Sequence, residues 1–270
     1  MPLRQSPQCQ FCRLMLRWRA FAKRLAQGLF APFPFGPDVA KASLMETTAK
    51  DDHPMTDFAA RRVMMVDTQV RPSDVTKFPI IAAMLTIPRE AFVPTQFRET
   101  AYVGEPIALG GGRVMLDARV LAKLLDALNI LPTEMVLDIG CGLGYSAAVV
   151  SRLADAVVAV ETDPMAGDAQ TRLLAQSIDN VAVIAGPLAQ GCAKHGPYDV
   201  VIIQGGVEMI SPEIQKQIKD GGRIAAVFMD GPLGVAKIGY KSGKEMSWRS
   251  VFDASLPVLA DFVVKKDFAL

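Results

Sequence analysis

The sequence contains little cysteine and histidine, almost no net charge and no long apolar run. Its four cysteines, among 270 residues, are too few and too scattered for a disulfide-stapled secreted scaffold, and they favour a reducing, cytoplasmic compartment. Twenty-nine Lys and Arg against 28 Asp and Glu give a formal charge of +1, so no general basic field is available to hold nucleic acid. Charges, Gly or Pro interrupt every apolar stretch before the roughly 18 to 20 residues that a bilayer-spanning helix needs. The sequence therefore predicts neither a nucleic-acid partner nor a membrane partner.

Apolar residues make up half of the chain, and 21% of its residues are charged. A chain of this length and composition can bury the core of one large domain or two small ones. The first 54 residues differ from the rest, because they contain eight basic and four acidic residues. We interpret 1–54 as a disordered extension or as sequence upstream of a true start at Met55, with a transit peptide as the alternative. Residues 55–270 are predicted to form a single domain.

Two of the cysteines have a spacing that metal sites use. Cys9 and Cys12 are separated by two residues, as in half of a zinc site. No second cysteine pair and no histidine cluster lies nearby to complete four ligands. No metal site is therefore predicted.

Apolar, β-branched runs alternate with helical patterns through the second half of the chain. Asp117 stands where the N-cap of a helix should be, and apolar residues at helical spacing follow it until Pro132. Five apolar runs are typical of strands: Met135–Ile139, Ala156–Val160, Val181–Ala185, Val200–Ile203 and Arg223–Phe228. Continuous apolar strands between helices predict a doubly wound, mainly parallel α/β sheet that is covered on both faces.

The segments around these strands have their own patterns. Residues 56–100 indicate a helical lead-in, with helical patterns at 58–66 and 75–85. Ser211 is predicted to start a helix that Asp220-Gly221-Gly222 would stop. The tail, 230–270, is predicted to form an antiparallel hairpin that closes the edge of the sheet.

The chemistry is concentrated at the turn after the first strong strand. The strand ends in Asp138, and glycines follow at 140, 142 and 144, with Cys141 between the first two. Glycines there allow a sharp turn and the close approach of a ligand. Glu161 ends the next strand, 21 positions after Gly140, where a carboxylate can accept both hydroxyls of a ribose. The turn and this acid together predict a nucleoside cofactor.

Two cofactor classes fit such a turn. A dinucleotide site has the pattern G-x-G-x-x-G, but its last glycine would fall at position 145, which is Tyr. Asp138 would also repel a phosphate, whereas it suits the cationic amino-acid part of S-adenosylmethionine. A tight turn without any ligand is the remaining alternative.

Five blocks follow one another along the sequence: Ile87–Val93 (IPREAFV), Ala101-Tyr102, Glu105–Ile107, the glycine run 110–112 and the turn Asp138–Tyr145. In their order and approximate spacing, these blocks resemble the protein-L-isoaspartate O-methyltransferase family. The resemblance extends from about residue 58 to about residue 230 and does not cover 1–54. It implies a Rossmann-like methyltransferase that uses S-adenosylmethionine to esterify isoaspartyl carboxylates, so its partners would be damaged proteins or peptides. The cofactor site would comprise Asp138, Gly140, Cys141, Gly142, Gly144 and Glu161.

The sequence departs from the family's pattern at two places. After its glycine run the family usually has Gln-Thr-Ile-Ser-x-Pro, with the serine near the transferred methyl, and here Leu116 takes the position of that serine. The family's Gly-Asp-Gly, whose acid helps to read the adenine, is Gly186-Pro187-Leu188. Adenine would then depend on backbone N–H groups and apolar packing.

Three functional hypotheses follow from these matches and departures. The chain is an isoaspartyl methyltransferase, a methyltransferase for another acceptor, or a non-catalytic protein that binds S-adenosylmethionine. No residue is predicted to act as a catalyst, because a carboxylate nucleophile is already ionised at neutral pH and needs positioning above all. Arg71, Arg113 or Arg119 could orient that carboxylate, although a solvated surface position is the commoner role of an arginine. The sequence does not indicate an oligomeric state.

Overall fold

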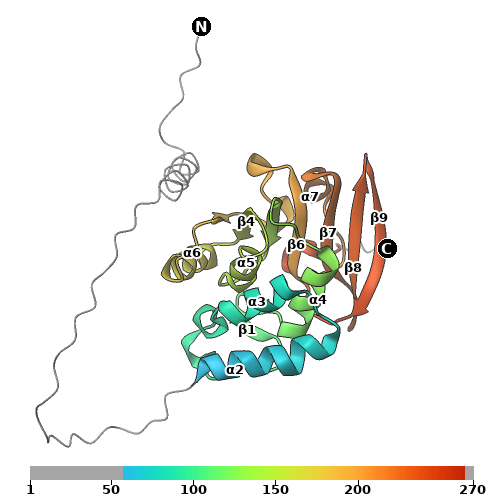
Figure 1. Ribbon diagram of the computed structural model, residues 1–270. Helices are drawn as coiled ribbons and strands as arrows, with labels where there is room; N and C mark the ends of the chain where they lie inside the picture. The colour runs from blue at the N-terminus through green and yellow to red at the C-terminus, as the bar shows by residue number, and fades with distance from the viewer. Residues whose placement is uncertain (1–56, 265–270) are drawn as a thin grey trace, which may run out of the picture. The chain divides into compact units, whose positions relative to one another are not determined.

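Two short helices lead into the main sheet. The computed structural model describes residues 57–264 (Figure 1). Helix α2 spans Phe58–Met65 and helix α3 spans Phe78–Thr86, with single π-helical and 3-10 turns between them. Helix α3 starts three residues later than its sequence pattern indicates, because Pro79 occupies its first turn. The predicted helical lead-in is confirmed.

A seven-stranded sheet forms the centre of the fold (Figure 1). Its strands are β3 (Met135–Ile139), β4 (Ala156–Glu161), β5 (Val181–Ala185), β6 (Tyr198–Val207), β7 (Ile218–Asp230), β8 (Leu233–Ser242) and β9 (Glu245–Asp253). They lie in the order β5-β4-β3-β6-β7-β8-β9, where the first five are parallel and the last two are antiparallel. The five predicted strands and the hairpin at the edge of the sheet are confirmed.

Neighbouring side chains along each central strand point to opposite faces of the sheet. Val136 belongs to one apolar core and Leu137 to the other. The first core contains the apolar faces of three helices, which are α4 (Ala118–Leu128), α5 (Tyr145–Val150) and α6 (Met165–Ala175). The second face is covered by one short helix, α7 (Pro212–Lys216), and by single turns. Both faces are covered, as predicted, but most of the helical cover lies on the first face.

The predicted N-caps are confirmed, whereas the predicted helix stop is wrong. Asp117 accepts a hydrogen bond from the backbone N–H of Val120 at 2.9 Å, and Ser211 caps α7. Helix α7 has already ended when the chain reaches Asp220-Gly221-Gly222, which belongs to β7. A Cβ on Gly222 would lie 2.9 Å from the carbonyl oxygen of Asp199, so this glycine permits a close approach between strands.

The segment that follows β9 is fastened to the end of β6. Gly206 donates its N–H to the carbonyl of Pro257 and accepts from the N–H of Leu259, each at 2.9 Å. A Cβ on Gly205 would lie 2.6 Å from Cγ of Leu259, so the glycine leaves room for that side chain. The N–H of Glu208 donates to the carbonyl of Phe262. These contacts hold the carboxyl end of β6 in place.

A two-stranded hairpin lies apart from the main sheet. Strand β1 (Ile107–Gly110) pairs antiparallel with β2 (Arg113–Met115). The glycines at 110, 111 and 112 all have positive φ values and form its turn. Ile107 and Met115 are buried and attach the hairpin to the first core.

Some expectations concern residues that the structure does not describe. The interpretation of 1–54, including Cys9 and Cys12, lies outside residues 57–264. Within the described residues, no helix is long and apolar enough to cross a membrane.

Candidate cofactor site

The glycine turn follows strand β3, at which the strand order of the sheet changes direction. Strand β3 lies between β4 and β6, so the strands that follow it are added on opposite sides. Parallel α/β sheets bind ligands at such a switch point, beyond the carboxyl ends of the strands. Gly140, Gly142 and Gly144 have φ values of +76°, +57° and +98°, which side chains rarely allow. The fold thus places the predicted turn where this class of sheet binds its ligands.

Asp138 lies fully buried beneath the turn. Its Oδ2 accepts a hydrogen bond from Ser146 Oγ at 2.6 Å, and its Oδ1 accepts one from Gln204 Nε2 at 2.8 Å. Burial raises the pKa of Asp138 to about 6, which the negative charge of Glu161 reinforces and the two hydrogen bonds oppose. At neutral pH the carboxylate therefore holds a negative charge directly behind the turn.

Glu161 is also fully buried, and donors of the chain itself surround its carboxylate. Oε2 accepts from the backbone N–H of Gly142 at 2.8 Å. Oε1 accepts from the backbone N–H of Thr162 at 2.8 Å, from the hydroxyl of Thr162 at 3.2 Å and from Nε of Arg113 at 2.9 Å. The acid predicted to hold a ribose thus contacts the turn and forms a buried ion pair with the hairpin.

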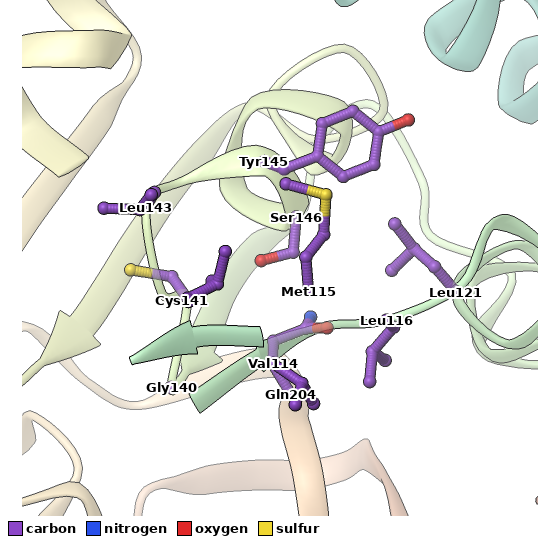
Figure 2. Close-up of a pocket in the computed structure, with 11 residues that line it drawn as sticks. Val114, Met115, Leu116, Leu121, Gly140, Cys141, Leu143, Tyr145, Ser146 and Gln204 are labelled. Atoms are coloured by element: carbon purple, nitrogen blue, oxygen red, sulfur yellow. The ribbon is translucent and has the colours of Figure 1, made fainter. Parts of the chain in front are cut away.

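The hairpin covers the turn and leaves little space beneath it. Leu109 lies so close to Gly142 that a Cβ on that glycine would be 2.5 Å from Leu109 Cδ1. A cavity of about 10 Å³, the volume of about one water molecule, lies beside the turn, and Val114, Met115 and Leu116 are among the residues that line it (Figure 2).

Two other predicted site residues differ in where they face. Cys141 lines the cavity, and burial raises the pKa of its thiol well above the usual range, so the sulfur is not a reactive thiolate. A Cβ on Gly144 would meet Cγ of Leu173 at 3.2 Å, so this glycine faces helix α6. All six predicted residues therefore gather at one place, with Gly140 and Cys141 lining the cavity itself.

The three candidate arginines lie in different environments. Arg71 is exposed and pairs with Asp67 at 3.0 Å, and Arg119 is exposed on α4. Arg113 is buried in its ion pair with Glu161, so the surface position that is commoner for arginine is wrong for this residue. Of these three side chains, Arg113 is the one in contact with the site.

The two positions that depart from the family's pattern have different surroundings. Leu116 is buried and lines the cavity. The backbone N–H of Leu188, which follows Pro187, donates to Oδ2 of Asp261 at 2.9 Å. The N–H of Leu188 therefore already has a hydrogen-bond acceptor, the carboxylate of Asp261 in the segment after β9.

Leu109, Ser146 and Gln204 are among the residues of the site that sequence reasoning missed. Gln204 ends the apolar run of β6, beside the end of β3, so a polar residue at that place was a usable signal. Ser146 stands one position into the helix after the glycines. For Leu109 the sequence offers no signal, because only the fold of the hairpin brings it to the turn.

Comparisons with known proteins agree with this geometry. A sequence model described as Protein-L-isoaspartate(D-aspartate) O-methyltransferase matches residues 62–235. The protein-L-isoaspartate O-methyltransferase of Koribacter versatilis is 33% identical over 171 residues, which cover 63% of this chain and 77% of that protein. Protein-L-isoaspartate O-methyltransferase 1 of Rhodopseudomonas palustris is 35% identical over 170 residues, with coverages of 63% and 69%.

Two solved structures share the fold. A protein-L-isoaspartate O-methyltransferase structure aligns with a TM-score of 0.64 at 22% identity, covering 75% of this chain and 66% of that one. A Plasmodium falciparum protein, provisionally described as a protein-L-isoaspartate O-methyltransferase, was solved with S-adenosyl-L-homocysteine. It aligns with a TM-score of 0.64 at 14% identity and coverages of 74% and 98%. The doubly wound, Rossmann-like fold predicted from the sequence is confirmed, and the chain belongs to the protein-L-isoaspartate O-methyltransferase family.

Proposed function

We propose that this protein transfers a methyl group from S-adenosylmethionine to the carboxylate of isoaspartyl residues in damaged proteins. One observation carries the proposal. The glycine turn at the switch point and the carboxylate of Glu161 lie in direct contact, joined by the 2.8 Å hydrogen bond from Gly142, in a chain of this family. The partners would be proteins or peptides that contain isoaspartyl residues.

The residues at the turn fit the chemistry of this cofactor. Left-handed glycines admit a ligand close to the backbone, Glu161 offers acceptors to ribose hydroxyls, and Asp138 places negative charge near a cationic amino-acid group. When bound, the cofactor supplies a methyl group on a positively charged sulfur. Cys141 and Gly140 would border it, since both line the cavity.

The chain's own task in such a reaction is to position the acceptor and to exclude water. The cavity beside the turn is lined mainly by apolar side chains, among them Met115, Leu116 and Leu121 (Figure 2). An isoaspartyl carboxylate is ionised at neutral pH, so its attack on the methyl needs an in-line approach and no general base. The loss of the family's serine at Leu116 therefore removes a possible donor to the acceptor without removing a proton carrier.

A second candidate is a methyltransferase that acts on a different acceptor. Leu116 favours it, because an apolar side chain stands where the family usually has a hydroxyl next to the acceptor. A less polar acceptor than a carboxylate would suit this lining.

Transfer of labelled methyl from S-adenosylmethionine to an isoaspartyl peptide tests the proposal, with the matched aspartyl peptide as the control and the full chain as the enzyme. We expect label on the isoaspartyl peptide alone. The variant Leu116→Ser, which restores the hydroxyl usual in the family, should raise the rate on the same peptide. No label with either protein, although S-adenosylhomocysteine binds in calorimetry, would refute the isoaspartyl acceptor and leave the second candidate.

We further infer that residues 55–270 act as one catalytic domain in the cytoplasm. Support for the location comes from the two cysteines among residues 57–264, Cys141 and Cys192, which are both buried free thiols.

A further inference from the structure

We propose that the β1–β2 hairpin competes with the cofactor, because Leu109 lies against Gly142 and Arg113 sets the affinity for S-adenosylmethionine by competing with its ribose for Glu161. The proposal rests on the proposed function, since it concerns the same site. Within the hairpin, Arg113 contacts Glu161 and Leu109 contacts the turn at Gly142.

The first argument is the hydrogen-bonding capacity of Glu161. An ionised carboxylate offers about four lone-pair positions. Three donors share Oε1, which are the N–H and the hydroxyl of Thr162 and Nε of Arg113, and the N–H of Gly142 takes one position on Oε2. One position on Oε2 is left, so a second ribose hydroxyl cannot bind Glu161 until one of these donors leaves.

The second argument is the contact between Leu109 and the glycine turn. Leu109 Cδ1 lies 2.5 Å from the point where a Cβ of Gly142 would be, so the hairpin occupies the close approach that the glycine provides. A bound cofactor would have to displace this leucine.

The third argument is that the hairpin is the part able to move. Gly142 and Thr162 are fixed by the turn and by strand β4, whereas β1 and β2 form a separate two-stranded sheet. Two-stranded hairpins have little stability of their own, and a Cβ on any of the exposed glycines at 110–112 would have no atom within 4 Å. The part that can move is therefore the exposed glycine turn with the flanking Leu109 and Arg113, while Ile107 and Met115 keep the hairpin attached to the first core.

At the adenine side of the site, too, a group that would bind the cofactor is already hydrogen-bonded within the chain. The N–H of Leu188, one of the backbone groups on which adenine would depend, donates to Asp261 at 2.9 Å. Two groups that would bind the nucleoside, the carboxylate of Glu161 and the N–H of Leu188, are thus already hydrogen-bonded to other side chains of the protein.

Calorimetric titration with S-adenosylhomocysteine tests the proposal on the full-length protein and three variants. In Arg113→Gln, the residue usual in the family replaces the competing cation, and we expect binding about tenfold tighter or more. Leu109→Ala keeps the ion pair and removes the apolar side chain from the turn, so it should also bind more tightly. Arg152→Gln changes an exposed arginine beyond helix α5 and serves as the matched control, with an unchanged dissociation constant.

Hydrogen exchange of the amides in 107–115 gives a second readout. We expect faster exchange in Arg113→Gln without any ligand, and faster exchange in the wild type when S-adenosylhomocysteine is added. Binding by the wild type with equal or weaker binding by both hairpin variants would overturn the competition and leave the proposed function intact. Absence of binding by all four proteins would instead overturn the cofactor assignment, and the proposal with it.

Discussion

The buried carboxyl group of Asp138 should make the protein less stable as the pH rises from 4 to 7. Burial raises its pKa from 3.8 to about 6 in the folded protein. Between these two values the folded state binds the proton more tightly than the unfolded state, so the free energy of unfolding falls as the pH rises. At 1.36 kcal/mol per pKa unit, the full loss above pH 6 is about 3 kcal/mol.

Urea unfolding of the wild type and of Asp138→Asn, measured from pH 4 to pH 8, tests this reasoning. Asparagine does not titrate and can still bond both Ser146 and Gln204. The free energy of unfolding of the wild type, relative to that of the variant, should fall by about 2.5 kcal/mol between pH 4 and 7 and then stay level. Parallel curves for the two proteins would refute the raised pKa.

Asp199→Asn is a control of the opposite sign. Burial alone would raise the pKa of Asp199, but hydrogen bonds from Lys219 and from the N–H of Met135 outweigh it and lower the pKa. The stability that this carboxylate contributes should therefore be complete above pH 4 and be lost as the pH falls further. The difference between wild type and this variant should stay nearly level from pH 4 to 7.

Two further predictions concern stability away from the site. Arg223→Met should lower the free energy of unfolding by about 2 to 4 kcal/mol, because it breaks a largely buried, two-pronged ion pair with Glu134 in which both N–O distances are 2.8 Å. A loss below about 0.5 kcal/mol in urea unfolding would contradict this. Gly234→Ala should lower the free energy of unfolding more than Gly231→Ala does, because a Cβ at position 234 would overlap the backbone oxygen of Ala254. A Cβ at position 231 would meet no atom, so Gly231→Ala should cost only the strain of a positive φ, about 1 kcal/mol. Equal melting temperatures for the two alanine variants would show that the backbone at Ala254 yields easily.

Local signals in the sequence were sufficient for the strands and for the glycine turn. Each central strand is a continuous apolar run, because side chains on both of its faces are buried. The glycines at 140, 142 and 144 reflect backbone angles that other residues avoid, and Glu161 follows from the length of one strand-helix-strand unit. The strands, the glycine turn and the place of Glu161 all depend on residues that are close together in the sequence, so local sequence patterns are enough to predict them.

The contacts between distant segments could not be predicted in the same way. Arg113 and Glu161 are 48 residues apart, and nothing in the spacing of either residue indicates the other. The sequence therefore left Arg113 with the commoner surface role of an arginine. The helix stop predicted at Asp220-Gly221-Gly222 was wrong for a related reason. Glycine is common both at the end of a helix and where two strands approach closely, so the local pattern does not distinguish the two.

The attachment of residues 257–262 to strand β6 has a consequence for the order of biosynthesis. Gly206 and Leu259 hold the end of β6, only two residues beyond Gln204, which bonds Asp138. Every strand of the sheet is translated before residues 257–262 emerge from the ribosome. A nascent chain can therefore build its central strands early, but it completes the carboxyl end of β6, and with it the support of the binding turn, only after the last strand has been made.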